Sequence, residues 1–394
     1  MTKTFKYIGP WIYLFLGINI ALYFFIFFFQ DKISFNIRNY TISAHHYLVD
    51  ARSRGGSFDF LRALGQFDAQ WYLKIAEKGY PENPQLIPNV NKDINSGLSY
   101  AFFPLYPLLL SLFNTVINNI ELTAFAVTNV LLLINFISLY YVVSQLYSEH
   151  IARKTVFLFF LFPFSIFFRS YFTEGLFLFL LIWFSYFLIQ RQWFYSACFL
   201  SLLFVTRPNG LFLAPLFLFF ASQEYKKNRI RLSSFFQLGT IAIFPFFLWL
   251  WFCFYYTSDP FYWFSIQSNW YNFQQFSFPL TNNLQTIFQF FSLPLHAFHK
   301  SKIEVLTILT AGALLFYSRK KIKPELWWIS LLFWAVPLIF KDTMSFSRYQ
   351  IISFPLFIYL ATALKGLSYK LVILVFLFYL FFTSLFFVNW YWVG

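Results

Sequence analysis

Long runs of apolar residues, separated by short polar segments, make up most of the chain. Such runs are typical of membrane-spanning helices, which need about 20 mostly apolar residues. The first run begins at Trp11, and the others follow a single long polar region. The helices that this pattern predicts cover residues 11–30, 102–117, 122–147, 151–168, 172–190, 193–205, 211–221, 235–256, 303–317, 325–340, 351–364 and 371–392.

The long polar region covers residues 31–100. Residues 46–49 and 61–76 carry apolar side chains at helical spacing between charges, which predicts helices lying on the membrane surface. A second large loop is expected over residues 257–302. We therefore expect residues 1–394 to form a single transmembrane domain with two large loops on one face.

The composition supports a membrane protein of the all-α, polytopic class. Hydrophobic residues make up 59% of the chain and charged residues only 11%. A soluble domain is about one quarter charged, so a soluble enzyme, a disordered protein and a fibrous repeat are excluded. The 63 phenylalanines and 13 glycines favour bulky helices over a porin-like barrel. Cys198 and Cys253 lie in apolar runs and are expected to be packing residues.

The net charge of +14 comes from basic clusters between the apolar runs, which indicates membrane topology rather than nucleic-acid binding. All of these clusters face the cytoplasm only if residues 102–117 do not cross the membrane. This arrangement gives about eleven crossings, with the N-terminus inside and the C-terminus outside. Trp390, Tyr391 and Trp392 are interpreted as an interfacial anchor. The clusters are Arg153 with Lys154, Arg191, residues 226–231, residues 319–323, and Lys365 with Lys370.

Two carboxylates on the expected outer face are candidates for chemistry. Asp68 lies among aromatic and apolar residues, where partial desolvation would suit a general base acting on a hydroxyl. The alternative is that Asp68 only caps the helix that follows. Glu174 opens an apolar helix, where it could simply complement the helix dipole or pair with Arg169.

Two arginines are suited to recognise a phosphate group. Arg207 precedes a turn that contains Asn209, and Arg348 stands at the outer start of an expected helix. The alternative for both is snorkelling to lipid headgroups. His296 and Lys300 precede another helix and could bind phosphate. No zinc-protease or nucleotide-binding motif is present, so neither a metal nor another cofactor is expected.

Five segments, in order, resemble the motifs of one mannosyltransferase family, whose best-known member adds the second mannose in glycosylphosphatidylinositol (GPI) anchor synthesis. The chain departs from the family pattern at Phe67, Thr173 and Pro208, which puts the substrate in doubt. Its compactness points to a prokaryotic relative. The segments are residues 65–80, 101–107, 163–177, 206–210 and 347–355, with Gly-Gln-Phe-Asp-Ala-Gln-Trp-Tyr at 65–72 and Thr-Arg-Pro-Asn-Gly at 206–210.

The resemblance implies a GT-C fold, that of polytopic glycosyltransferases whose site faces away from the cytoplasm. The donor would be a polyprenyl- or dolichyl-phosphate sugar, with mannose as the first candidate. The acceptor would be a hydroxyl of a lipid-linked or cell-envelope glycan. The protein would lie in a bacterial plasma membrane, or in the endoplasmic reticulum if eukaryotic. The family analogy gives Asp68 the catalytic role and makes Glu174, Arg207 and Arg348 site candidates.

The expected mechanism is an inverting transfer in which Asp68 takes the acceptor proton. Arg207 and Arg348, with His296 or Lys300, would neutralise the lipid phosphate as it leaves. A transporter or flippase of lipid-linked sugars is one alternative, and it would show inverted repeats and ionisable residues at mid-membrane. A glycan polymerase or ligase is another. The remaining candidates for substrate binding are Gln66, Trp71, Tyr72, Arg169, Asn209 and Tyr349.

Overall fold

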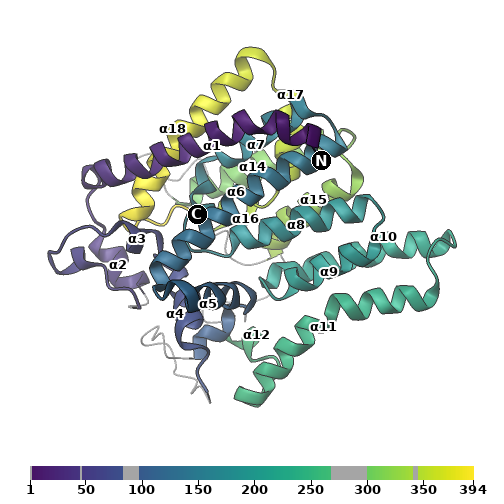
Figure 1. Cartoon of the computed structure of the whole chain (residues 1–394), viewed down its shortest axis with the longest axis horizontal. Coiled ribbons are helices and arrows are strands. Elements are labelled where there is room, and N and C mark those ends of the chain that lie inside the picture. The colour runs from purple at the N-terminus through teal and green to yellow at the C-terminus, as the bar shows by residue number, and fades with distance from the viewer. Residues whose placement is uncertain (1, 45–46, 83–96, 268–299, 340–344) are drawn as a thin grey trace.

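The computed structural model describes residues 2–44, 47–82, 97–267, 300–339 and 345–394. Within these ranges all the regular secondary structure is helical, without a strand, so the all-α prediction is confirmed (Figure 1). Cys198 and Cys253 are both free, and Cys253 is buried.

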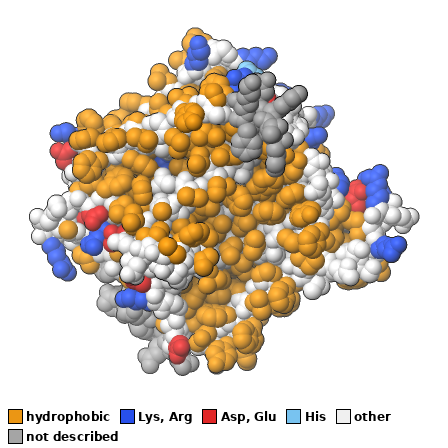
Figure 2. Space-filling view, viewed as in Figure 1, with side chains coloured by type: hydrophobic (Ala, Val, Ile, Leu, Met, Phe, Trp, Pro, Cys, Tyr) orange, Lys and Arg blue, Asp and Glu red, His pale blue; other side chains and the backbone are white. Residues whose placement is uncertain are grey.

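Four of the described helices are long and apolar enough to cross a membrane. They expose large apolar side chains, such as Tyr13 at 77% of its surface and Leu374 at 62%. Figure 2 shows apolar side chains over most of one face, with charged groups towards its margins. This surface is the one expected of an integral membrane protein. The four helices are α1 (Thr2–Phe29), α6 (Ile120–Leu146), α11 (Leu232–Thr257) and α18 (Gly366–Val388).

Shorter helices pack between these four. Helix α8 lies against α6 and α9, and α17 lies against α7. The count of eleven crossings and the GT-C fold remain predictions. The shorter helices are α5 (Leu105–Ile117), α7 (Glu149–Phe160), α8 (Glu174–Ile189), α9 (Trp193–Phe204), α10 (Ala214–Lys226), α12 (Tyr262–Gln267), α14 (Lys300–Ser318), α15 (Pro324–Ile339), α16 (Phe346–Gln350) and α17 (Phe354–Ala363).

Two predicted helices are interrupted by proline. The helix expected over 151–168 ends at Phe160, and the 3-10 helix η4 (Pro163–Phe168) follows it. Proline has no N–H to continue the helical ladder, and it holds the preceding Phe162 in an extended conformation, with ψ 137°. In the same way, residues 211–213 belong to the 3-10 helix η5 (Pro208–Leu213), which precedes α10.

The surface helices differ from the prediction as well. Residues 47–49 are not helical, and His46 lies outside the described residues. The helix expected over 61–76 is divided into α3 (Phe60–Leu64) and α4 (Ala69–Lys78). Phe67, between them, has a left-handed backbone with φ 54°, which no helix can contain. The other short elements of the first loop are η1 (Gln30–Lys32), α2 (Ile37–Ser43), η2 (Ala51–Arg54) and η3 (Gly97–Ala101).

Basic clusters that are distant in sequence come together at one end of the bundle. The N-terminal end of α1 and the α10–α11 connection lie to the right in Figure 1, whereas α4 and the end of α18 lie to the left. The contacts at the basic end join Arg153 with Trp11, Lys154 with Leu364, Arg191 with Glu325, and Lys323 with Tyr147.

Helix α5 begins and ends at the opposite end of the bundle. The Leu105 N–H donates to the Val205 carbonyl at 3.0 Å, beside the end of α9. After Asn118, only Asn119 separates α5 from α6, which then runs to Tyr147 at the basic end. With 13 residues, α5 is about 20 Å long, short of a ~30 Å hydrocarbon core. That α5 does not cross a membrane remains a prediction.

Cysteine labelling tests this arrangement with a matched pair of exposed asparagines. Asn118 and Asn228 both have a left-handed backbone, at φ 53° and 57°. In a background without Cys198 and Cys253, we expect a membrane-impermeant thiol reagent to label Asn118→Cys in intact cells. Asn228→Cys, among the basic residues, should react only after permeabilisation. Labelling of Asn118→Cys only after permeabilisation would show that α5 crosses.

Candidate functional site

Four charged residues from distant parts of the chain meet at the end of the bundle opposite the basic clusters. Nη1 of Arg348 lies 3.2 Å from Oδ2 of Asp68, and Nε of Arg348 lies 2.5 Å from Oε1 of Glu174. Nη1 of Arg207 lies 2.6 Å from the same Oε1. Asp68, Glu174, Arg207 and Arg348 are called the charge cluster below. The two arginines therefore converge on one carboxylate oxygen.

The break between α3 and α4 places Asp68 in this cluster. Phe67 turns the chain there and packs its ring 5.0 Å from that of Trp390. Nε2 of Gln66 donates to the Val388 carbonyl at 2.9 Å, which ties the break to the end of α18. The Asp68 side chain makes no capping hydrogen bond to α4. The capping interpretation is therefore wrong, and Gln66 holds the local fold together.

Glu174 is the first residue of α8 and is completely buried, with 0% of its side chain exposed. Asp68 exposes 28%, and so solvent reaches Asp68 but not Glu174. A buried carboxylate is costly unless it is paired, and here two guanidinium groups share it. Glu174 is one of the two carboxylates that the sequence makes candidates for catalysis, but its burial fits a role in holding Arg207 and Arg348. Of the two carboxylates, Asp68 is the one that a ligand could reach from solvent.

Aromatic rings surround the guanidinium group of Arg348. Its Cζ lies 4.4, 5.1 and 5.5 Å from three ring centroids, a geometry that favours a cation. Burial opposes its charge, but the Glu174 and Asp68 carboxylates outweigh this effect and raise the pKa of Arg348 above its ordinary value. Arg348 therefore stays charged. The rings belong to Phe172, Phe167 and Trp392.

Arg207 has an extended backbone just before η5, the turn that also contains Asn209. Its guanidinium lies 5.8 Å from the ring centroid of Tyr349, the neighbour of Arg348. Only about 10% of its side chain is exposed. Both arginines are thus turned into the protein, so the snorkelling interpretation does not hold for either.

Two further aromatic candidates are buried on α4. Trp71 stacks on Phe102 with ring centroids 5.4 Å apart, and Tyr72 packs edge-on against Tyr106 at 5.6 Å. Burial raises the pKa of Tyr72 to about 12, and the charges of Arg207, Glu174 and Arg348 also act on it. Tyr72 therefore lies close to the charge cluster, whereas Trp71 belongs to the core beside it.

Arg169 is fully buried away from the cluster. It donates to Asn19 Oδ1 at 2.7 Å, to the Ser165 carbonyl at 2.9 Å and to the Phe160 carbonyl at 3.1 Å. The expected Arg169–Glu174 pair is therefore wrong. Since Asn19 lies near the middle of α1, Arg169 is recessed into the bundle rather than exposed on an outer turn.

Two of the candidates cannot be placed. His296 lies outside the described residues, and so does the side chain of Lys300, although Lys300 opens α14. Among the described residues, no group of three or more His, Cys, Asp or Glu side chains is arranged to hold a metal ion.

The residues after α18 depart most clearly from the sequence interpretation. Trp390 is 1% exposed and Trp392 packs against Arg348, so neither is an anchor at a lipid surface. Phe167 and Phe172 lie in segments that carry the family motifs, and that position could have pointed to them. Nothing in the sequence pointed to Trp392.

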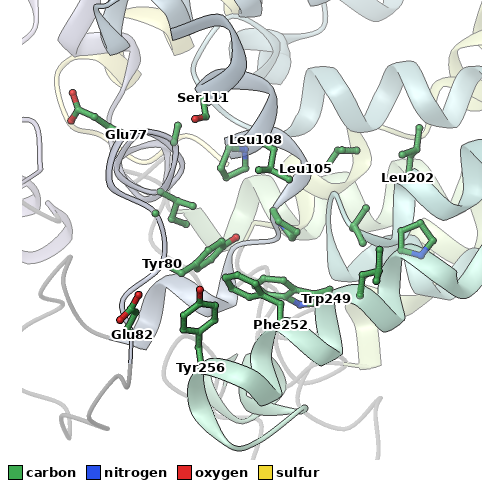
Figure 3. A pocket seen from close by; sticks show the side chains of 18 residues that line it. Glu77, Tyr80, Glu82, Leu105, Leu108, Ser111, Leu202, Trp249, Phe252 and Tyr256 are labelled. Carbon is green, nitrogen blue, oxygen red and sulfur yellow. The ribbon is translucent and has the colours of Figure 1, made fainter. Parts of the chain in front are cut away.

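An apolar groove of about 700 Å³ lies beside the charge cluster, between α4, α5, α9 and α11 (Figure 3). Val205 lines it two residues before Arg207, and Ile75 lines it one turn after Tyr72 on α4. Tyr80, Trp249 and Phe252 form an aromatic wall, with Tyr80 5.2 Å from Trp249. Its described lining is otherwise mostly apolar, with two carboxylates, Glu77 and Glu82, and no Lys or Arg. This α5–α11 groove therefore suits an apolar chain, with the nearby cations beyond it.

Comparisons of the chain with protein family models, curated proteins and solved structures find no match. The charge cluster and the groove therefore have to be interpreted from their own geometry.

Replacing Glu174 tests its role in holding the two arginines. Glu174→Gln leaves two buried guanidinium groups without their shared charge, and losing one partner of a buried ion pair costs about 3–5 kcal/mol. We expect the unfolding free energy of the purified protein in detergent to fall by this amount. Asp68→Asn, at a partly exposed carboxylate, is the control and should cost much less. Equal losses for the two variants would contradict the assignment.

Proposed function

We propose that the protein is an inverting glycosyltransferase, with mannose as the first candidate sugar. It moves the sugar from a polyprenyl-phosphate donor to a hydroxyl of a lipid-linked or cell-envelope glycan. The observation that carries this proposal is the salt bridge between a partly exposed carboxylate, Asp68, and the buried Arg348, which shares Glu174 with the buried Arg207. The ordered motifs that resemble the GPI mannosyltransferase II family include all four residues of the cluster.

The chemistry assigned to the cluster is a single displacement. Asp68 accepts the proton of the acceptor hydroxyl as the hydroxyl oxygen forms a bond to the anomeric carbon of the sugar. The bond between that carbon and the phosphate oxygen breaks on the opposite face, and the lipid phosphate leaves with the electron pair. The configuration therefore inverts. Arg207 and Arg348 stabilise the negative charge that the phosphate gains.

Because Asp68 contacts Arg348, binding of the donor phosphate would also change how readily Asp68 accepts a proton. An adjacent cation makes a carboxylate a weaker base. The incoming phosphate competes with Asp68 for Nη1 of Arg348, while Glu174 keeps its hold on Nε. Donor binding thus frees Asp68 to accept a proton, and the base becomes active only when the donor is in place.

The α5–α11 groove supports a lipid-linked donor. An isoprenoid chain in the groove would lie between α5 and α11, with its phosphate turned towards Arg207, two residues beyond Val205. Each buried methylene contributes about 0.8 kcal/mol, so a few isoprene units suffice for tight binding.

The proposed protein is integral to the membrane, and its site faces away from the cytoplasm. Lys and Arg between membrane helices favour the cytoplasm, and the basic clusters lie at the end of the bundle away from Asp68. The membrane would be a bacterial plasma membrane, or the endoplasmic reticulum in a eukaryote.

Replacement of Asp68 tests the proposed reaction. Asp68→Asn should lower sugar transfer from mannosyl-phosphoryl-polyprenol by about 10²–10⁴-fold, the contribution of a general base. Binding of the donor should survive, because Arg207 and Arg348 remain on Glu174. The measurements are labelled glycan formed and polyprenyl phosphate released. Asp31→Asn, an exposed carboxylate in the same loop, is the matched control. More than about a tenth of the wild-type rate in Asp68→Asn would exclude this role.

A second variant tests the groove separately. Leu202→Trp fills the groove from α9 and should raise KM for a long-chain donor about 10-fold, equivalent to about two buried methylenes. KM for a donor with a ten-carbon lipid should change little. Leu374→Trp, on the exposed face of α18, is the matched control. An equal effect on short and long donors would place the lipid elsewhere.

A further inference from the structure

The segment Asn389–Gly394 folds back from the end of α18 onto the charge cluster. Nδ2 of Asn389 donates to the Gln30 carbonyl at 2.9 Å, and the Asn36 N–H donates to the Asn389 carbonyl at 3.0 Å. Trp390 then has a left-handed backbone with φ 64°, which reverses the direction of the chain. A bulky residue is rare in this conformation and needs support from its surroundings.

The first loop supplies that support. Nε1 of Trp390 donates to Oδ2 of Asp50 at 2.9 Å, and Nδ2 of Asn39 donates to the Trp390 carbonyl at 2.5 Å. Nη2 of Arg52 donates both to Asp50 and to the Val388 carbonyl, at 2.8 and 2.7 Å. Hydrogen bonds to the side chain and to the carbonyl of Trp390 therefore hold the reversal in place. Support of this kind for a strained backbone indicates that the position of residues 391–394 is important.

The reversal brings Trp392 to Arg348. Its ring centroid lies 5.5 Å from the guanidinium carbon of Arg348 and 5.0 Å from the ring of Phe67. The chain continues so close to the site that a Cβ on Gly394 would lie 2.6 Å from Phe167 and 3.0 Å from Cβ of Arg348. This part of the segment is thus packed against the residues that surround the guanidinium.

We propose that Trp392 is a positioning residue for Arg348. Its ring, with those of Phe167 and Phe172, fixes the guanidinium plane so that Nε meets Glu174 and Nη1 meets Asp68. No hydrogen bond joins Nη2 to the described residues, so the fixed plane presents Nη2, next to the Nη1 that Asp68 shares, to an anionic group of the ligand. The catalytic consequence rests on the proposed function, whereas the effect on anion binding does not.

Substitutions at Trp392 separate ring electrostatics from simple packing. Trp392→Phe keeps an aromatic face, Trp392→Leu keeps only apolar volume, and Trp392→Ala keeps neither. Tyr391→Ala is the control, because Tyr391 packs edge-on against Phe386 instead. The probe is farnesyl phosphate, titrated calorimetrically against the full chain in detergent. We expect the Leu and Ala variants to bind about 3- to 30-fold more weakly, the Phe variant within about 3-fold of wild type, and Tyr391→Ala unchanged.

Equal binding by the Phe and Leu variants would overturn the positioning role, and so would wild-type binding by the Ala variant. Failure of the wild-type protein to bind farnesyl phosphate would overturn the anion site itself. If the Phe and Leu variants differ but no sugar is transferred, the proposed function fails while this inference stands.

The transfer assay adds a readout that packing alone would not change. Loosening Arg348 in Trp392→Leu weakens its hold on the Asp68 carboxylate, and a neighbouring cation favours the charged form of a carboxylate. The acid side of the pH profile of kcat/KM, which reports the free enzyme in which Arg348 contacts Asp68, should therefore move to higher pH in Trp392→Leu and stay at the wild-type position in Trp392→Phe. An unchanged profile in both variants would argue against positioning.

Discussion

The buried carboxylate of Glu174 is the point on which the site depends. One of its oxygens is shared by Arg207 and Arg348, which come from segments more than 130 residues apart. Charges removed from water are tolerated only when paired, so each partner fixes the position of the others. Asp68 joins through Arg348 and is the one member with appreciable exposure. A buried ion network thus holds one carboxylate, Asp68, at a surface that solvent reaches.

The balance of charge within this network suits the proposed reaction, in which the donor phosphate gains negative charge. Two carboxylates and two guanidinium groups leave the set neutral, so a singly charged phosphodiester is attracted only moderately. A phosphate that leaves from a sugar gains a second negative charge, and the fixed guanidinium groups respond most strongly at that stage. Stronger interaction with the transition state than with the bound donor is what accelerates a reaction.

The sequence predicted the helical class, because that class follows from the length of the apolar runs. It also predicted the residues that meet in the cluster, because membrane topology does not explain their charges. It did not predict the interruption at Phe67 or at Pro163, since hydrophobic periodicity continues through both positions. The Arg169–Asn19 bond and the position of Trp392 were also missed. Both depend on contacts between distant segments, Arg169 with Asn19 and Trp392 with Phe67 and Arg348, which local pattern does not encode.

The buried Arg169 has a consequence for biosynthesis. Its guanidinium is satisfied by Asn19 on α1 together with carbonyls of its own segment, without a carboxylate in these bonds. An arginine entering hydrocarbon alone costs about 2.5–3.5 kcal/mol even on the mildest scale. Helix α1 is synthesised first, and so Asn19 is already available when Arg169 leaves the ribosome. The connection between α7 and α8, which carries Arg169, can therefore pack in the membrane only if α1 is still beside it during insertion.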